Sequence, residues 1–294
     1  MSLPVQLAIN ALQVGAVYVV FALGLTLIFG VMRIINFAHG EFFTLTGLSV
    51  STLMPYVTSA LGLPGWASYV LCFLAALVII AALAWLTFIS VMTRFVQDTI
   101  GALIVTLGLS MVMQSLFIWG FGNSPRRVPA LVPGVTDIAG GRISNDRLII
   151  FGLAIVLTAL LWQFLKRTKA GTALRAVADD REAAQLQGID DRRIIMLGFV
   201  VGSILAAIAG GLIAPTTVLG PSIGADYLTK AFIIIIIGGT GSVPGAIVGG
   251  FVVGAIESVA GFYLDGTAAL ILLLVVVSAI LLVRPQGLLG NATR

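Results

Sequence analysis

The sequence predicts an all-α protein, built as a polytopic bundle of transmembrane helices. Its 294 residues are 59% hydrophobic and only 10% charged, and their mean hydropathy is +1.13. Ordinary water-soluble domains are far more polar than this. Apolar stretches close to the length of about 20 residues that a helix needs to cross a bilayer recur along the whole chain. We therefore expect a single transmembrane domain over residues 1–294, with eight or nine spans.

Six spans follow from the apolar stretches that lie between charged residues. In chain order they are expected at 5–29, 42–61, 66–92, 100–121, 148–165 and 194–219. A further span is expected near the end of the chain, at 267–283. Each stretch is long enough to cross the apolar core of a bilayer as a helix.

The stretch before the last span is rich in glycine and is harder to divide. It reads KAFIIIIIGGTGSVPGAIVGG from Lys230 to Gly250. The Gly and Pro residues in its middle favour a broken helix, which membranes tolerate where the freed backbone faces protein or a cavity. It forms either one long helix or two short ones joined between Gly238 and Pro244. Two crossings give nine spans and one crossing gives eight, which leaves the side of the C-terminus open.

The distribution of basic residues predicts the orientation in the membrane. The loop 166–193 holds seven of the sixteen Lys and Arg residues of the chain. Because basic residues collect in cytoplasmic loops, we expect this loop inside and the preceding loop, 122–147, outside. The net charge of +4 is then a topology signal, and we expect no nucleic-acid partner.

The second half of the loop 166–193 is a charged island in an otherwise apolar chain. It reads DDREAAQLQGIDDRR and carries eight charged residues. At helical spacing one apolar face collects Ala173, Ala176, Val177, Ala183 and Ala184, and Asp180 interrupts this stripe. We expect one short amphipathic helix that stops at Gly188. Its shallow alanine face suits docking of another protein, and the alternative is a helix that only solvates the surface.

Several segments resemble one family of membrane transport proteins. Glu182, Ala183, Ala184 and Gly188 read E-A-A-x-x-x-G, which is similar to the coupling-loop motif of ABC importer permeases. The I-x-L-P that often follows in that motif is absent, because GFVV occupies 198–201. GLTLIFGVMRIINFAHGEFF at 24–43, TKAGTALRAVADDREAAQLQGID at 168–190, the glycine-rich stretch and LLVRPQGLLG at 281–290 resemble, in matching order, the LivH-like branched-chain amino-acid permeases.

This resemblance implies a permease subunit of an ABC importer that moves leucine, isoleucine or valine across the bacterial inner (plasma) membrane. Its implied partners are a second homologous permease, two cytosolic ATPase subunits, a periplasmic or other extracytoplasmic substrate-binding protein, and membrane lipid. The chain itself would be no enzyme and would need no cofactor, since ATP hydrolysis would occur on the partner ATPases. The implied ATPase-coupling residues are Arg175, Glu182, Ala183, Ala184 and Gly188.

Three other readings stay open. Within the same family, the chain could be a urea or short-chain amide importer permease. An ion-coupled secondary transporter would act without ATPases and would use Glu257, Asp226 or Lys230 for coupling. A purely structural membrane scaffold would give no transport phenotype.

Candidate pathway or gate residues fall in two regions. In MRIINFAHGEF, the residues Asn36, His39 and Glu41 are expected to form a polar lining near the cytoplasmic mouth, or to mark only a capped helix boundary. A membrane-embedded carboxylate is costly, so Glu257 is a functional candidate by its position. Gly238, Gly239 and Gly241 are further candidates, because glycines remove side-chain obstruction.

Glycines of the same stretch also predict close helix packing. The spacing of Gly241, Gly245 and Gly249, and that of Gly250 and Gly254, is G-x-x-x-G. Such spacing lets two membrane helices bring their backbones into contact. We expect these residues to pack helices within the subunit or at an interface between subunits.

Overall fold

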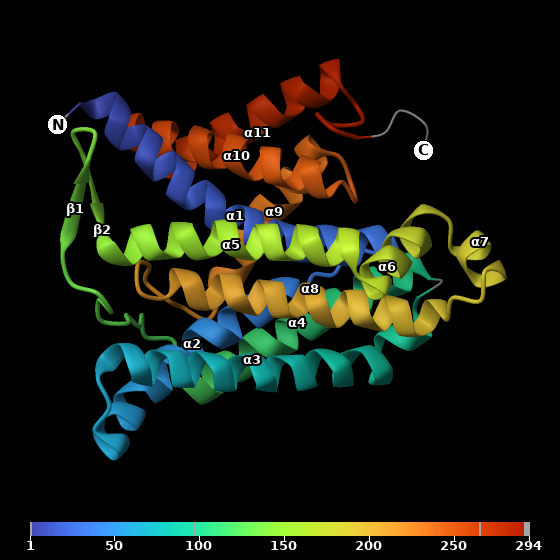
Figure 1. Ribbon diagram of the computed structural model, residues 1–294, viewed down its shortest axis with the longest axis horizontal. Helices are drawn as coiled ribbons and strands as arrows, with labels where there is room; N and C mark the ends of the chain where they lie inside the picture. The colour runs from blue at the N-terminus through green and yellow to red at the C-terminus, as the bar shows by residue number, and fades with distance from the viewer. Residues whose placement is uncertain (1, 97, 265, 291–294) are drawn as a thin grey trace.

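The computed structural model describes residues 2–96, 98–264 and 266–290 and shows a bundle of helices with their axes mostly side by side (Figure 1). The helices are α1 (Leu3–Met32), α2 (His39–Leu61), α3 (Gly65–Ser90), α4 (Thr99–Phe121), α5 (Asn145–Arg167), α6 (Lys169–Asp179), α7 (Arg181–Leu186), α8 (Asp191–Ile213), α9 (Ile223–Gly238), α10 (Val243–Tyr263) and α11 (Gly266–Val283), with a 3-10 turn η1 (Met92–Arg94). The predicted all-α membrane bundle is confirmed. Within the described residues, seven helices are long and apolar enough to cross a membrane, so the predicted count of eight or nine spans is not confirmed.

The bundle has two ends of different character. One end carries the small hairpin β1 (Val135–Ile138) and β2 (Gly141–Ser144), and the other carries α6 and α7, at the right of Figure 1. Helix α1 begins at the hairpin end, and the last described residues, after α11, lie at the α6–α7 end (Figure 1). We call them the hairpin end and the coupling-loop end.

The hairpin falls in a stretch for which the sequence predicted only a loop. Its strands pair antiparallel, with Ile138 opposite Gly141. The two residues between them, Ala139 and Gly140, have φ of 51° and 85°. Two positive φ values in a two-residue connection match the right-handed twist of the flanking strands. Strands of four residues are too short for their alternation to stand out from the surrounding loop.

Helix α1 is the centre of the bundle. It packs against α10, α8, α5 and α9, and nearly every residue from Gln13 to Met32 is buried. A helix that is apolar on all sides is expected in such a place. The core of the molecule therefore surrounds α1, whereas α3, α4, α5 and α11 present most of their surface outward.

Helix α2 begins inside the bundle and not at its surface. Arg33 ends α1 with a φ of 53°, and residues 34–38 run back along the helix they have just left. The His39 Nε2 atom then lies 3.3 Å from the carbonyl oxygen of Phe21. Phe21 precedes the end of α1 by eleven residues, or roughly 16 Å at 1.5 Å per residue.

The glycine-rich stretch forms two helices. α9 ends at Gly238 and α10 begins at Val243, and the two pack against each other as an antiparallel pair. The C-terminal ending then returns to α9: the Leu288 amide donates to the carbonyl of Ile237 at 2.6 Å, and the Leu289 amide donates to that of Gly238 at 3.1 Å. These bonds satisfy carbonyl groups that the end of a helix otherwise leaves without partners.

Other helix boundaries agree with the predicted spans to within a few residues, with one exception. The sixth span was expected to reach residue 219, but α8 ends at Ile213. Pro215 follows almost at once, and its ring cannot continue the hydrogen-bond pattern of a helix.

Candidate functional site

The loop 166–193 forms two helices, α6 and α7, so the prediction of one continuous amphipathic helix is wrong. Asp180 has an extended backbone, with φ −146° and ψ 109°, and it ends α6. Its carboxylate accepts a hydrogen bond from the Ala183 amide at 3.0 Å, which starts α7. A short acidic side chain offers such a cap more readily than it fits a helix interior. The polar residue that interrupts the alanine stripe is therefore the break between the helices.

The alanine face predicted for docking is partly turned into the protein. Val177 and Ala184 are buried, and Ala184 is only 4% exposed. Glu182 and Ala183 are exposed, and Leu186 at the end of α7 is 86% exposed. A partner that reaches this loop therefore meets the outer side of α7, and Ala184 lies beneath that surface.

The loop is fastened to the two helices that flank it. The Arg175 side chain donates through Nε to the carbonyl of Leu165 in α5 at 3.1 Å. Arg181 at the start of α7 forms an ion pair with Asp191 at the start of α8, with an N to O distance of 2.5 Å. Gly188 lies in the turn between α7 and α8 and has a φ of 81°. Arg181 thus links the start of α7 directly to the start of α8.

Three of the pathway candidates lie in the interior, at the start of α2. Asn36, His39 and Glu41 are 1%, 0% and 1% exposed. Glu41 accepts hydrogen bonds through Oε1 from Ser110 Oγ at 2.7 Å and from Gln114 Nε2 at 2.9 Å, both on α4. We call these three buried residues, which are close in sequence, the polar cluster; within it His39 faces α1 and Glu41 faces α4.

Each member of this polar cluster keeps one buried polar atom with no hydrogen-bond partner among the described residues. These atoms are Asn36 Nδ2, His39 Nδ1 and Glu41 Oε2. Buried polar groups in folded proteins normally have partners, so three such atoms within residues 36–41 are unusual. Sequence reasoning found these three residues but missed Ser110 and Gln114, which belong to a different apolar stretch.

Glu257 lies in a second polar group, where it is paired. Its Oε1 atom lies 2.6 Å from the ammonium of Lys230 on α9, and its Oε2 atom accepts from the Tyr18 hydroxyl at 2.5 Å. Lys230 also donates to the Tyr18 hydroxyl at 2.7 Å. A carboxylate held by a lysine is a poor carrier for a coupling proton, which disfavours the ion-coupled reading.

Aromatic rings lie between these two polar groups. Tyr227 stacks on Phe43, with ring centroids 4.4 Å apart, and its edge meets Tyr18 at 5.5 Å. Phe21 contacts the ring of His39 at 4.9 Å. Tyr18 and Phe21 are three residues apart on α1 and so face the same way. The sequence offered no sign of this aromatic group, because its members come from three distant stretches.

The glycines of α10 face two neighbours. On one side a Cβ at Gly245 would strike the backbone of Gly238, and a Cβ at Gly249 would lie 2.7 Å from the carbonyl oxygen of Ile234, so this side packs on α9. Gly241 lies in the connection before α10 with a φ of 78°, which means that its predicted place in a packing stripe is wrong.

The other side of α10 packs on α1. A Cβ at Gly250 would lie 2.6 Å from Val19 Cγ2, and one at Gly254 would lie 2.6 Å from Gly15 Cα. Gly239 does not join the polar cluster either, because it lies against the C-terminal ending beside Gly287.

Comparison with known proteins identifies one family. A family described as "Branched-chain amino acid transport system / permease component" matches residues 7–283. The chain is 32% identical to the high-affinity branched-chain amino acid transport system permease protein LivH of Escherichia coli (strain K12), over 97% of this chain and 95% of that protein. It is 31% identical to BraD of Pseudomonas aeruginosa, which has the same description, with the same shares covered. No solved structure matches it.

Proposed function

The chain belongs to the branched-chain amino acid transport permease family, and from that premise we propose how it works within an importer. It is a multi-pass permease of the plasma membrane in a branched-chain amino acid transport system, with leucine, isoleucine or valine as cargo. The observation that carries the proposal is the folded loop of α6 and α7, which stands outside the bundle and is tied to α5 and α8 (Figure 1).

We propose that the loop 166–193 is cytoplasmic and is the docking site of an ATPase. Glu182, Ala183 and Leu186 form its exposed contact surface, and the ion pair of Arg181 with Asp191 passes movement into α8. Arg175 holds the loop to α5. One such loop on this chain and one on a second homologous permease would receive the two cytosolic ATPase subunits.

Movement of α8 would reach the polar cluster by direct packing. A Cβ at Gly202 of α8 would lie 2.6 Å from the carbonyl oxygen of Gly24 in α1, and Gly24 in turn lies beside the ring of His39. Backbones this close cannot shift independently, because packed interiors transmit strain. Alternating access would follow when ATP binding closes the ATPases and α8 displaces α1 and α2 around Asn36, His39 and Glu41.

We propose nine crossings, with α2 and α9 as the two spans beyond the seven that length and apolarity identify. α2 has 23 residues and α9 has 16, and both pack inside the bundle. The position of the C-terminal ending supports an odd number. Pro285 and Gln286 line a cavity together with Lys166 and Arg175, which puts this ending on the same side as the coupling loop.

The cargo would cross along an apolar path at the interface with the second permease and would be delivered by an extracytoplasmic binding protein. Tight binding in the permease would slow release, so the choice of cargo would rest mainly with the binding protein. A urea or short-chain amide importer would use the same coupling.

Affinity purification of the tagged protein from its native membrane in mild detergent tests the proposal. We expect two ATPase subunits and a second permease to remain bound. Replacing Glu182 with Lys should release the ATPases, while Asp137→Lys, an exposed acidic residue in β1 at the hairpin end, should not. Recovery of the folded chain without ATPases would overturn the proposal.

A further inference from the structure

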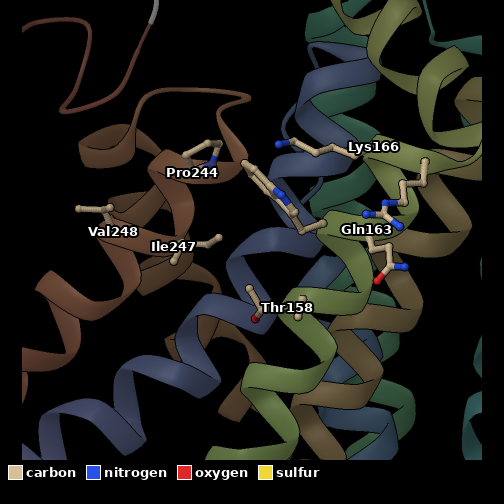
Figure 2. Close-up of a pocket in the computed structure, with 9 residues that line it drawn as sticks. Thr158, Gln163, Lys166, Pro244, Ile247 and Val248 are labelled. Carbon is tan, nitrogen blue, oxygen red and sulfur yellow. The ribbon is translucent and has the colours of Figure 1, made fainter.

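A groove runs along the outside of the bundle between α5 and α10, close to the coupling-loop end. Its volume is about 620 Å³, and Figure 2 shows its two walls. One wall is formed on α5 by Thr158, Ala159 and Trp162, and the other on α10 by Pro244, Ile247 and Val248. Both helices pack on α1, which holds the walls apart. The groove is therefore a built feature of the fold.

The groove changes character at one end. Lys166 reaches across it from α5 toward Pro244 on the opposite wall (Figure 2), and its ammonium lies 4.6 Å from the centre of the Trp162 ring. Arg167 lines the same end. Among the described residues that line this groove, none is acidic. It thus has apolar walls along its length and two positive charges at its mouth.

The residues around the groove indicate which of its ends lies at the level of the lipid headgroups. Trp162, Lys166 and Pro244 also line a second cavity of about 540 Å³, which contains Arg175 and Ser242. Tryptophan and lysine are typical of the level at which lipid headgroups meet the apolar core. The mouth therefore lies where headgroups lie, and the apolar walls lie where acyl chains lie.

We propose that this groove binds an anionic phospholipid, with an acyl chain between α5 and α10 and the phosphate at Lys166 and Arg167. Charge complementarity selects the anionic class, because a zwitterionic headgroup brings its own positive charge to the same two cations. The remainder of the second cavity is a poorer place for phosphate, since Asp179 lines it. The lipid bridges the transmembrane helices and the base of the coupling loop.

The site has a consequence for transport that rests on the proposed function. α6 begins at Lys169, three residues after Lys166, and Arg175 binds the carbonyl of Leu165. A lipid phosphate at Lys166 would hold this junction in place. Removal of anionic lipid should then lower the ATP-driven transport rate, whereas lipid binding itself requires neither ATPase nor cargo.

Native mass spectrometry of the purified chain in detergent tests the binding directly. Phosphatidylglycerol and phosphatidylcholine of equal chain length are added in turn to delipidated protein. Each basic residue near an anionic lipid contributes about 1 kcal/mol, so two of them predict a preference of about tenfold or more for phosphatidylglycerol. Inorganic phosphate at the same concentration should not displace the lipid, because it fills no apolar groove.

Two kinds of variant localise the site. Lys166→Gln combined with Arg167→Gln should abolish the preference, and Val248→Trp should lower retention of both lipids by filling the groove. Arg192→Gln combined with Arg193→Gln removes the same charge from exposed positions outside the groove and should change neither. Unfolding midpoints confirm that each variant is folded.

Three results would overturn the proposal: equal retention of the two lipids, full retention by the Lys166 and Arg167 variant, or displacement by phosphate. Cross-linking of the Val248→Cys variant to a second permease in the intact complex would also overturn it, because the groove would then be a protein interface. Loss of ATPase binding without loss of the lipid preference would refute the proposed coupling and leave this site intact.

Discussion

Gly254 in α10 lies so close to Gly15 in α1 that a Cβ at position 254 would sit 2.6 Å from the Gly15 Cα atom. Contact between two backbones is how membrane helices associate where apolar burial gives no advantage over lipid. Gly254→Ala should therefore separate α1 from α10 and destabilise the protein by about 1–3 kcal/mol, the usual cost of overpacking. The unfolding midpoint in detergent measures this loss.

Gly261 offers a matched control on the same helix. A Cβ there would have no neighbour within 4 Å. Gly261→Ala should leave the midpoint unchanged or raise it slightly, because alanine favours a helix more than glycine does. Equal losses at both positions would show that the close contact with Gly15 is not what holds α10.

The pair of Lys230 and Glu257 predicts a coupled loss of stability. Glu257→Gln or Lys230→Met removes one partner and leaves the other charged side chain unpaired. Breaking a fully buried pair costs about 3–5 kcal/mol. Here the side chains are 22% and 33% exposed, so we expect less than that range.

The double variant should lose less stability than the sum of the two single variants, because no unpaired charge remains. Thermal unfolding of all four proteins gives the interaction term. Additive losses would mean that the two side chains do not interact in the folded protein.

Gly188 predicts a backbone effect that is independent of packing. Its φ is 81°, and a Cβ there would meet nothing within 4 Å. Gly188→Ala should cost about 1–2 kcal/mol of strain in the turn between α7 and α8, whereas Gly188→Asn should cost less, since asparagine visits this region more readily.

The ATPase activity of the assembled complex is the readout for the Gly188 variants. We expect this activity to be highest with Gly188, lower in Gly188→Asn and lowest in Gly188→Ala. Identical activity in the three proteins would exclude a role for this turn in coupling.

The polar cluster predicts that shape and hydrogen bonding matter more than charge at position 41. Glu41→Ala would leave the buried Ser110 hydroxyl without this acceptor, at about 1–3 kcal/mol, and would also remove the acceptor of the half-buried Gln114 amide at a smaller cost. Glu41→Gln keeps an oxygen that can accept from both. We expect the glutamine variant to unfold near the wild-type midpoint and the alanine variant well below it.

Transport by the glutamine variant then separates two roles for Glu41. Uptake near the wild-type rate would match a structural node, as we expect from its two hydrogen bonds. Abolished uptake with an unchanged midpoint would contradict this and would assign the negative charge itself to the transport cycle.

Most helices could be predicted from the sequence because a membrane helix is defined by a local property, a long apolar stretch between charges. The start of α2 could not be predicted in this way. Residues 34–38 run back into the bundle, and this path is possible because α1 and α4 supply hydrogen-bond partners there. The break at Asp180 was visible as an interruption, but its effect depended on a single hydrogen bond to the Ala183 amide.

The sequence by itself determined the class of protein, the membrane bundle, the position of the charged loop 166–193 and the family, because each depends on composition or on residues close together in the chain. Only the tertiary structure decided which polar residues act together. Glu41 meets α4, Glu257 meets α9 and α1, and Ala184 turns inward. Those pairings join residues far apart in sequence, and an apolar stretch carries no periodic pattern that says which of its faces meets which neighbour.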